Sequence, residues 1–186
     1  MRVFTGIRLD SETKEKIESE LRPFKKMAAA APIRWVNPDC IHLTLKFIGE
    51  VADRTYPALE RALSGVRAGA PCCRLRIRGF GKFPPENGLA IFWAGVEAGS
   101  FLSGLFERIE AALQPLGIPT EARPFSPHIT LGRNKANADF RVLIERMAAS
   151  RQLDIAELTV DRFQIFKSQL TPQGPIHSVL KEIPFA

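Results

Sequence analysis

Two short segments of the chain combine residue types that can transfer protons and bind an anion. Each places a histidine two residues before a threonine, with aliphatic residues in the other positions: His42-Leu43-Thr44-Leu45 and His128-Ile129-Thr130-Leu131. Alternating polar and aliphatic residues are typical of a half-buried strand, so the histidine and threonine of each copy should share one face. A histidine with its ordinary pKa of about 6.5 gives or takes protons near neutral pH.

Such a pair of segments suits a displacement at phosphorus. In-line attack on a phosphate ester needs a base on one side and an acid on the other, and two histidines facing one cleft supply both. The hydroxyls of Thr44 and Thr130 can bind the non-bridging phosphate oxygens. We therefore expect one catalytic site that contains His42 and His128 and needs neither a metal ion nor a cofactor. The residues themselves do not say which histidine is the acid.

Three other interpretations of these histidines stay open. A zinc site needs three or four clustered ligands, and the chain has three histidines in all, with no carboxylate at ligand spacing from either segment. A cysteine nucleophile is conceivable because Cys40 precedes His42 by two residues. Either histidine could also be an ordinary polar residue on a solvated strand, although a repeat of the segment argues against that.

The elements that must position the two segments recur in one order along the chain. The two histidines are 128 − 42 = 86 residues apart, close to half of the 186 residues. Patterns of strand, helix, His-x-Thr strand, helix and strand precede and follow a turn-rich joint at residues 84–88. Asp10 or Ser11 can cap the first helix and Asp53 the second. We interpret residues 1–186 as one bilobal domain, an internal duplication whose similar halves pack about an approximate twofold axis.

Composition and charge restrict the setting and the partner. Apolar residues make up 45% and charged residues 25%, as in ordinary globular proteins, and no apolar run is long enough to span a membrane. Three cysteines form no disulfide framework, so we expect a reducing cytoplasm. The net charge of +6 favours an anionic partner such as nucleic acid or phosphate.

Longer stretches around the two segments carry a family resemblance. Arg34-Trp35-Val36 followed by residues 37–51 (NPDCIHLTLKFIGEV), and Phe125-Ser126-Pro127 followed by residues 128–133 (HITLGR), resemble the two-histidine phosphoesterase superfamily. Within it, the whole chain is most similar to the bacterial and archaeal RNA 2′,3′-cyclic phosphodiesterases, also called 2′-5′ RNA ligases. The resemblance implies an α+β fold in which two antiparallel sheets line a central cleft with helices on the outside.

The resemblance also implies an activity and roles for individual residues. A cyclic phosphate at an RNA end would open to a 2′-phosphomonoester without metal, with His42 as proton donor and His128 as proton acceptor. Thr44 and Thr130 would bind the phosphate. Phe47 and Arg133 would flank the nucleobase, although each follows its histidine by five residues, an odd spacing that should turn it to the opposite face of a regular strand.

The substrate is less closely defined than the chemistry. Family members act on ends that include tRNA-splicing products, and some ligate RNA. The alternatives are a small cyclic nucleotide, ADP-ribose cyclic phosphate, or an RNA-binding module without catalysis. We expect a monomer.

Two further features have no assigned role. Arg74, Arg76 and Arg78 alternate with apolar residues and either line the cleft or lie on a solvated strand face. His177 occupies a place where the family pattern suggests a tyrosine.

Overall fold

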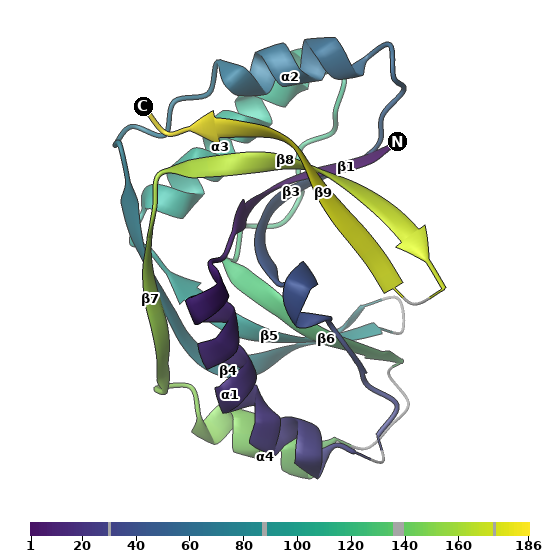
Figure 1. Ribbon diagram of the computed structural model, residues 1–186, viewed down its shortest axis with the longest axis vertical. Coiled ribbons are helices and arrows are strands. Elements are labelled where there is room, and N and C mark those ends of the chain that lie inside the picture. The colour runs from purple at the N-terminus through teal and green to yellow at the C-terminus, as the bar shows by residue number, and fades with distance from the viewer. Residues whose placement is uncertain (30, 87–88, 136–139, 173) are drawn as a thin grey trace.

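The computed structural model describes residues 1–29, 31–86, 89–135, 140–172 and 174–186. Within these residues it contains one curled antiparallel sheet of nine strands, flanked by four α-helices (Figure 1). The strands are β1 (Arg2–Arg8), β2 (Arg34–Trp35), β3 (His42–Glu50), β4 (Cys73–Glu86), β5 (Leu89–Glu97), β6 (His128–Lys135), β7 (Asp154–Val160), β8 (Arg162–Thr171) and β9 (Gly174–Pro184). The helices are α1 (Ser11–Met27), α2 (Tyr56–Ser64), α3 (Phe101–Leu113) and α4 (Arg141–Ala149), with short 3₁₀ turns η1 (Pro38–Cys40) and η2 (Gln114–Leu116).

The order of strands places the two histidine strands at the centre of the sheet. That order is β7-β4-β5-β6-β3-β1-β8-β9, and β2 pairs with β6 beside the point where β3 leaves it. The predicted α+β class with antiparallel strands is confirmed. The two expected sheets are joined into one, because Leu43 of β3 pairs with Ile129 of β6.

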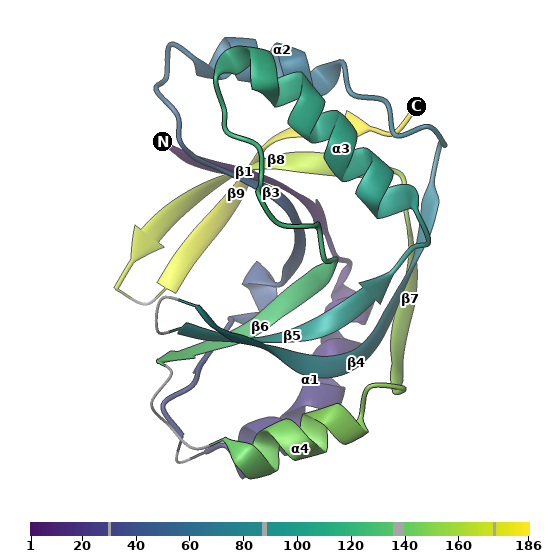
Figure 2. The ribbon, with the colours of Figure 1, turned by 180° about the vertical axis from the view of Figure 1, so that it is seen from behind.

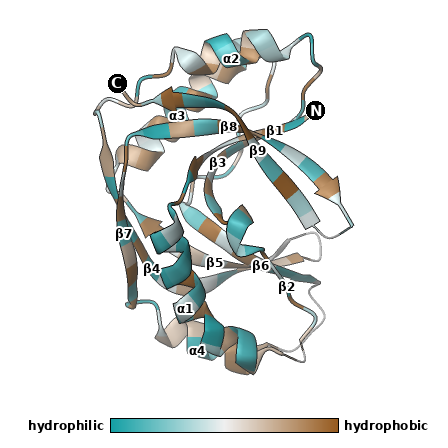
Figure 3. Cartoon of the chain, in the orientation of Figure 1, coloured by the Kyte–Doolittle hydropathy of each residue, from teal (hydrophilic) through white to brown (hydrophobic). Residues whose placement is uncertain are grey.

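The helices cover the outer face of the sheet, as expected, and they are arranged in two pairs. In Figures 1 and 2, α2 and α3 lie at one end of the molecule, next to β1, β3, β8 and β9, whereas α1 and α4 lie at the opposite end, against β7 and β4. Phe24 of α1 packs edge-on against Phe80 of β4, with ring centroids 5.1 Å apart. Hydrophobic and hydrophilic residues both occur along the strands, and hydrophilic residues cover much of α1 (Figure 3). None of the described helices is long and apolar enough to cross a membrane.

The predicted N-terminal cap of α1 is confirmed, and that of α2 is not. Asp10 caps α1, because its carboxylate accepts a hydrogen bond from the amide of Thr13 at 2.7 Å. The expected cap at Asp53 was wrong. Helix α2 begins later, after Thr55, and Pro57 occupies its first turn, where a missing amide donor costs nothing. In the expected joint at 84–88, Asn87 and Gly88 lie outside the described residues.

Candidate active site

The pairing of β3 with β6 brings the two His-x-Thr segments together. Leu43 and Ile129 pair across the strands and are fully buried on the side of the helices. Because successive side chains on a strand point to opposite faces, the histidines and threonines on either side of them lie on the uncovered face. His42, Thr44, His128 and Thr130 are all partly exposed there. We call this face of the sheet the cleft face.

Both histidines are oriented by the same local contact. Nδ1 of His42 lies 2.7 Å from the carbonyl oxygen of Cys40, and Nδ1 of His128 lies 2.8 Å from that of Ser126. A carbonyl oxygen only accepts hydrogen bonds, so in each ring Nδ1 carries the proton and donates it. The Nε2 atoms are then the ones free to exchange protons. In β3 the hydroxyl of Thr44 lies 3.0 Å from Nε2 of His42 and can donate to it.

Aromatic rings surround His42 more completely than His128. The ring centroids of Phe4, Phe166 and His177 lie 4.8, 5.8 and 5.1 Å from that of His42. Burial lowers the pKa of His42 to about 4, against the opposing effect of the Cys40 carbonyl and with smaller contributions from nearby positive groups. His128 has Phe83 edge-on at 4.8 Å, and burial followed by the charge of Arg133 lowers its pKa as well.

Two β-bulges change the direction of the residues that follow the histidine segments. Thr5 pairs with Lys46 and the next residue, Gly6, pairs with Thr44, so Leu45 is an extra residue in β3. In β6, Leu131 is extra in the same way, because Phe92 pairs with Gly132 and Trp93 with Thr130. One extra residue in a strand reverses the alternation beyond it.

The bulges therefore place Phe47 and Arg133 on the cleft face, each with its own histidine. The odd spacing counted against both residues only for a regular strand. Phe47 is 54% exposed, and its ring centroid lies 5.9 Å from that of Phe4, which also contacts His42. The charge of Arg133 acts on His42, His128 and His177 together, lowering the pKa of each.

At each bulge, one buried residue contacts the segment that leads into the other histidine strand. In β3 this position is Lys46, whose Nζ forms a buried ion pair with Glu110 and donates to the carbonyl of Pro119 at 2.8 Å. Pro119 belongs to the loop that continues to His128. In β6 it is Gly132, where an added Cβ would come within 2.9 Å of Trp35, in the segment that continues to His42.

The place of His177 at the site was not predicted: β9 brings its ring edge-on to that of His42. Phe4 also contacts His177, at 5.0 Å between ring centroids. This contact depends on the order of β3, β1, β8 and β9 across the sheet, and no local pattern around residue 177 indicates it.

The cysteine alternative has little support from the geometry. Cys40 lies in η1, before β3 begins, and its thiol donates to the carbonyl of Pro175 at 3.3 Å. Burial, the first cause, and the charge of Asp39 raise the pKa of this thiol. A thiol so held is a poor nucleophile near neutral pH.

No group of three or more histidine, cysteine, aspartate or glutamate side chains in the described part of the chain is arranged to hold a metal ion. Independence from metal remains a prediction, to be tested with a chelator.

This fold, with two inward-facing His-x-Thr strands, defines the class to which the chain belongs. It is a member of the 2′-5′ RNA ligase superfamily, whose family model matches residues 13–171. Among relatives, the RNA 2′,3′-cyclic phosphodiesterase of Thermotoga maritima is 34% identical over 185 residues, covering 100% of this chain and 96% of the relative. That of Thermus thermophilus is 34% identical over 193 residues, covering 98% and 89%.

Solved structures share the fold of this chain. The crystal structure of TT0787 of Thermus thermophilus superposes with a TM-score of 0.77 at 28% identity, covering 100% of this chain and 98% of that one. Escherichia coli LigT complexed with 3′-AMP has a TM-score of 0.80 at 24% identity, covering 98% and 97%, and supports the fold alone.

Proposed function

We propose that this chain hydrolyses 2′,3′-cyclic phosphates at RNA ends to 2′-phosphomonoesters, using His42 and His128 as an acid–base pair. The observation that carries the proposal is the matched orientation of the two rings. Each donates its Nδ1 proton to the carbonyl two residues earlier, so each has its Nε2 available on the same face of the sheet. The full-length relatives named as RNA 2′,3′-cyclic phosphodiesterases support the choice of substrate.

In the proposed reaction, water attacks the phosphorus while the bond from phosphorus to O3′ breaks. Nε2 of neutral His128 takes a proton from the water, and Nε2–H of protonated His42 gives one to the departing O3′. The products are a 2′-phosphomonoester and a free 3′-hydroxyl. His128 then carries the proton taken from the water and His42 has lost one to O3′, so exchange with solvent must deprotonate His128 and reprotonate His42. The assignment of donor and acceptor follows the family resemblance.

The threonines and Arg133 would stabilise charge on the phosphate during this step. Thr44 and Thr130 lie on the cleft face beside their histidines and can donate to the two non-bridging oxygens. The cation of Arg133 is close enough to act on both histidines and can approach the same phosphate. Phe47, largely exposed, offers a ring on which a base can stack.

His42 must also take up a proton from solvent when the substrate binds. A pKa of about 4 leaves His42 almost entirely neutral at pH 7. A bound phosphate anion raises the pKa of a nearby imidazole, because it favours the charged form. Binding and proton uptake are therefore coupled at this site.

An RNA 5′-hydroxyl in place of water would give a 2′-5′ linkage by the same displacement. Ligation is thus a second activity of the proposed site. We place the protein in the cytoplasm, where its three free cysteines would remain reduced.

The test is to measure turnover of an RNA oligonucleotide ending in a 2′,3′-cyclic phosphate by variants of the two histidines. His42→Ala and His128→Ala should each lower kcat by at least about 10²-fold. The double variant should lose little more than the worse single variant, because the pair acts as one unit. Near-normal turnover in either single variant would exclude the mechanism.

The assignment of roles can be tested with a substrate whose bridging O3′ is replaced by sulfur. A thiolate leaves without protonation, so this substrate should restore much of the rate to His42→Ala and little to His128→Ala. Equal rescue of both variants would contradict the assignment.

A further inference from the structure

We propose that the RNA chain leading to the cyclic phosphate binds across Arg2 and Arg34, and that the arginines of β4 do not contact it. This proposal rests on the proposed function and adds a second site, for the phosphodiester backbone of a single strand. Both residues lie on the cleft face but outside the His-x-Thr segments. Neither belongs to the catalytic group described above.

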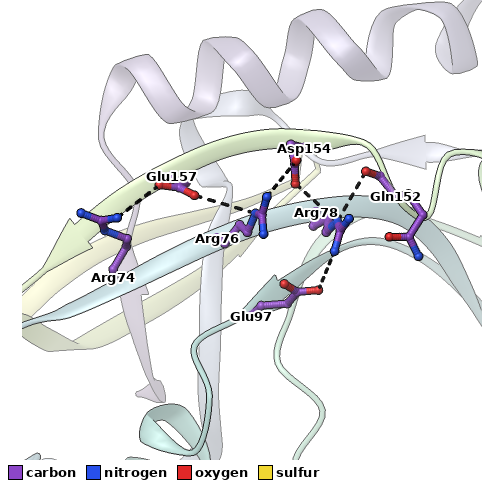
Figure 4. Close-up of polar contacts among 7 residues, drawn as sticks. All are labelled: Arg74, Arg76, Arg78, Glu97, Gln152, Asp154 and Glu157. Atoms are coloured by element: carbon purple, nitrogen blue, oxygen red, sulfur yellow. Dashed lines mark hydrogen bonds and ion pairs between the residues drawn. The ribbon is translucent and has the colours of Figure 1, made fainter.

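The arginines of β4 share the face of His128, since Arg78 pairs with Gly95 and Gly95 pairs with His128. Their charges are nevertheless balanced within the protein. Figure 4 shows the three guanidinium groups reaching carboxylates on β7 and β5. Arg74 pairs with Glu157, Arg76 with Asp154 and Glu157, and Arg78 with Asp154 and Glu97, at 2.9 to 3.9 Å. Three cations against three carboxylates leave 3 − 3 = 0 net charge to attract phosphate.

Arg34 has a different electrostatic setting. It pairs across the strands with Arg133, so the two side chains share one face, and Arg34 is exposed. No ion pair joins either arginine to a carboxylate within the described residues. Like charges directly opposite each other in a sheet destabilise the fold. The positive charge of the two guanidinium groups, which no described carboxylate balances, favours an anion at this place.

Arg2 reaches the same region from the opposite wall of the cleft. It lies two residues before Phe4 on β1, and Phe4 contacts His42, so Arg2 also lies on the cleft face. Burial, and after it the charge of Arg2, lowers the pKa of Arg133, so the two cations act on each other across the cleft face. Glu50 is opposite Arg2 in the strand register, but no ion pair connects these two described residues. Arg2 of β1, Arg34 of β2 and Arg133 of β6 therefore all lie on the cleft face.

The chemistry of these side chains fits a chain of phosphodiesters. A guanidinium group presents paired donors that match two phosphate oxygens, and it keeps its charge at any working pH. The cyclic phosphate itself would lie at the histidines, so further phosphates are needed to reach Arg2 and Arg34. A cyclic mononucleotide has none. The two arginines would thus distinguish an RNA end from a small cyclic nucleotide.

The experiment compares two variants with the same change of charge. Arg2→Ser/Arg34→Ser removes two cations from the proposed path, and Arg74→Ser/Arg76→Ser removes two from β4, so both lower the net charge from +6 to +4. Binding of a single-stranded RNA oligonucleotide ending in a 2′-phosphate is measured by fluorescence anisotropy over a series of salt concentrations. Each phosphate that the protein no longer neutralises should flatten the log–log slope by about 0.7.

We expect Arg2→Ser/Arg34→Ser to flatten the slope by up to about 1.4 and to weaken oligonucleotide binding, while Arg74→Ser/Arg76→Ser keeps the parent slope. Both variants should hydrolyse a cyclic mononucleotide at the parent rate, which also shows that they are folded. An unchanged slope in the first variant, or equal flattening in both, would overturn the proposal. Failure of the parent protein to hydrolyse any cyclic phosphate would instead overturn the proposed function.

Discussion

The neutral state of His42 in the empty cleft has a measurable effect on stability. In the unfolded chain this histidine has the ordinary pKa of 6.5, and in the folded protein burial lowers its pKa to about 4. Above pH 6.5 the ring is neutral in both states, so folding carries no proton-linked cost. As pH falls below 6.5, the unfolded chain binds a proton that the folded protein does not, and stability declines until the pH passes below about 4.

The size of the decline follows from the width of this window. A difference of 6.5 − 4 = 2.5 pH units corresponds to about 3 kcal/mol of unfolding free energy, at about 1.4 kcal/mol per unit. His42→Gln removes this contribution but keeps His128 and His177, whose pKa values are lowered in both proteins. The difference in stability between parent and variant should therefore isolate His42.

The assay is urea unfolding of both proteins at intervals from pH 4 to pH 8. The parent should lose stability relative to His42→Gln by up to about 3 kcal/mol as pH falls from 6.5 to 4. Adding inorganic phosphate should reduce this effect, because a bound anion favours the protonated ring. A difference that does not vary with pH would show that His42 has an ordinary pKa, and the proposed coupling of binding to proton uptake would then be wrong.

Three other predictions follow from the site. Since burial lowers the pKa of both histidines, the state with one protonated and one neutral ring becomes rarer as pH rises, so kcat/KM should fall between pH 6 and 8. A rate–pH profile that rises over this range would contradict it. Lys46→Met leaves Glu110 buried without its cation and should lower the free energy of unfolding in urea by about 3–5 kcal/mol. The double variant Lys46→Met/Glu110→Leu should recover most of that stability. Equal stability of the single and double variants would count against the ion pair. Gly132→Ala should displace Trp35 and lower kcat through His42. Gly104→Ala, where an added Cβ would meet only the flexible end of Arg108 at 3.3 Å, controls for the removal of a glycine. Equal effects of the two substitutions on kcat would refute the role of the contact with Trp35.

The central constellation could be predicted because it is local and repeated. Alternation alone places His42 with Thr44 and His128 with Thr130 on one face of each strand. The register repeats as well, since Gly6 pairs with Thr44 and Trp93 with Thr130, and we propose that this reflects duplication of one ancestral unit.

The positions of Phe47 and Arg133 could not be predicted because a bulge depends on two strands. Leu45 becomes an extra residue only by comparison with β1, and Leu131 only by comparison with β5. The residues of β3 and β6 alone therefore do not indicate that Leu45 and Leu131 form bulges.

The arginines of β4 were ambiguous for a similar reason. Their alternation predicts a shared face, but their partners Asp154 and Glu157 come from β7, and Asp154 is 78 residues from Arg76. Whether a strand of arginines attracts an anion depends on these distant carboxylates. His177 reaches His42 by the same kind of long-range pairing.

The most direct test of the central claim is the identity of the product formed in the presence of excess chelator. Phosphorus NMR of a reaction with an oligonucleotide ending in a 2′,3′-cyclic phosphate distinguishes the cyclic ester from the 2′- and 3′-phosphomonoesters. We predict that the cyclic signal converts to the 2′-phosphomonoester at a rate that chelator does not change, and that His42→Ala and His128→Ala leave it unconverted. Accumulation of the 3′-phosphomonoester, or loss of activity in chelator with recovery on adding zinc or manganese, would contradict the paired-histidine mechanism.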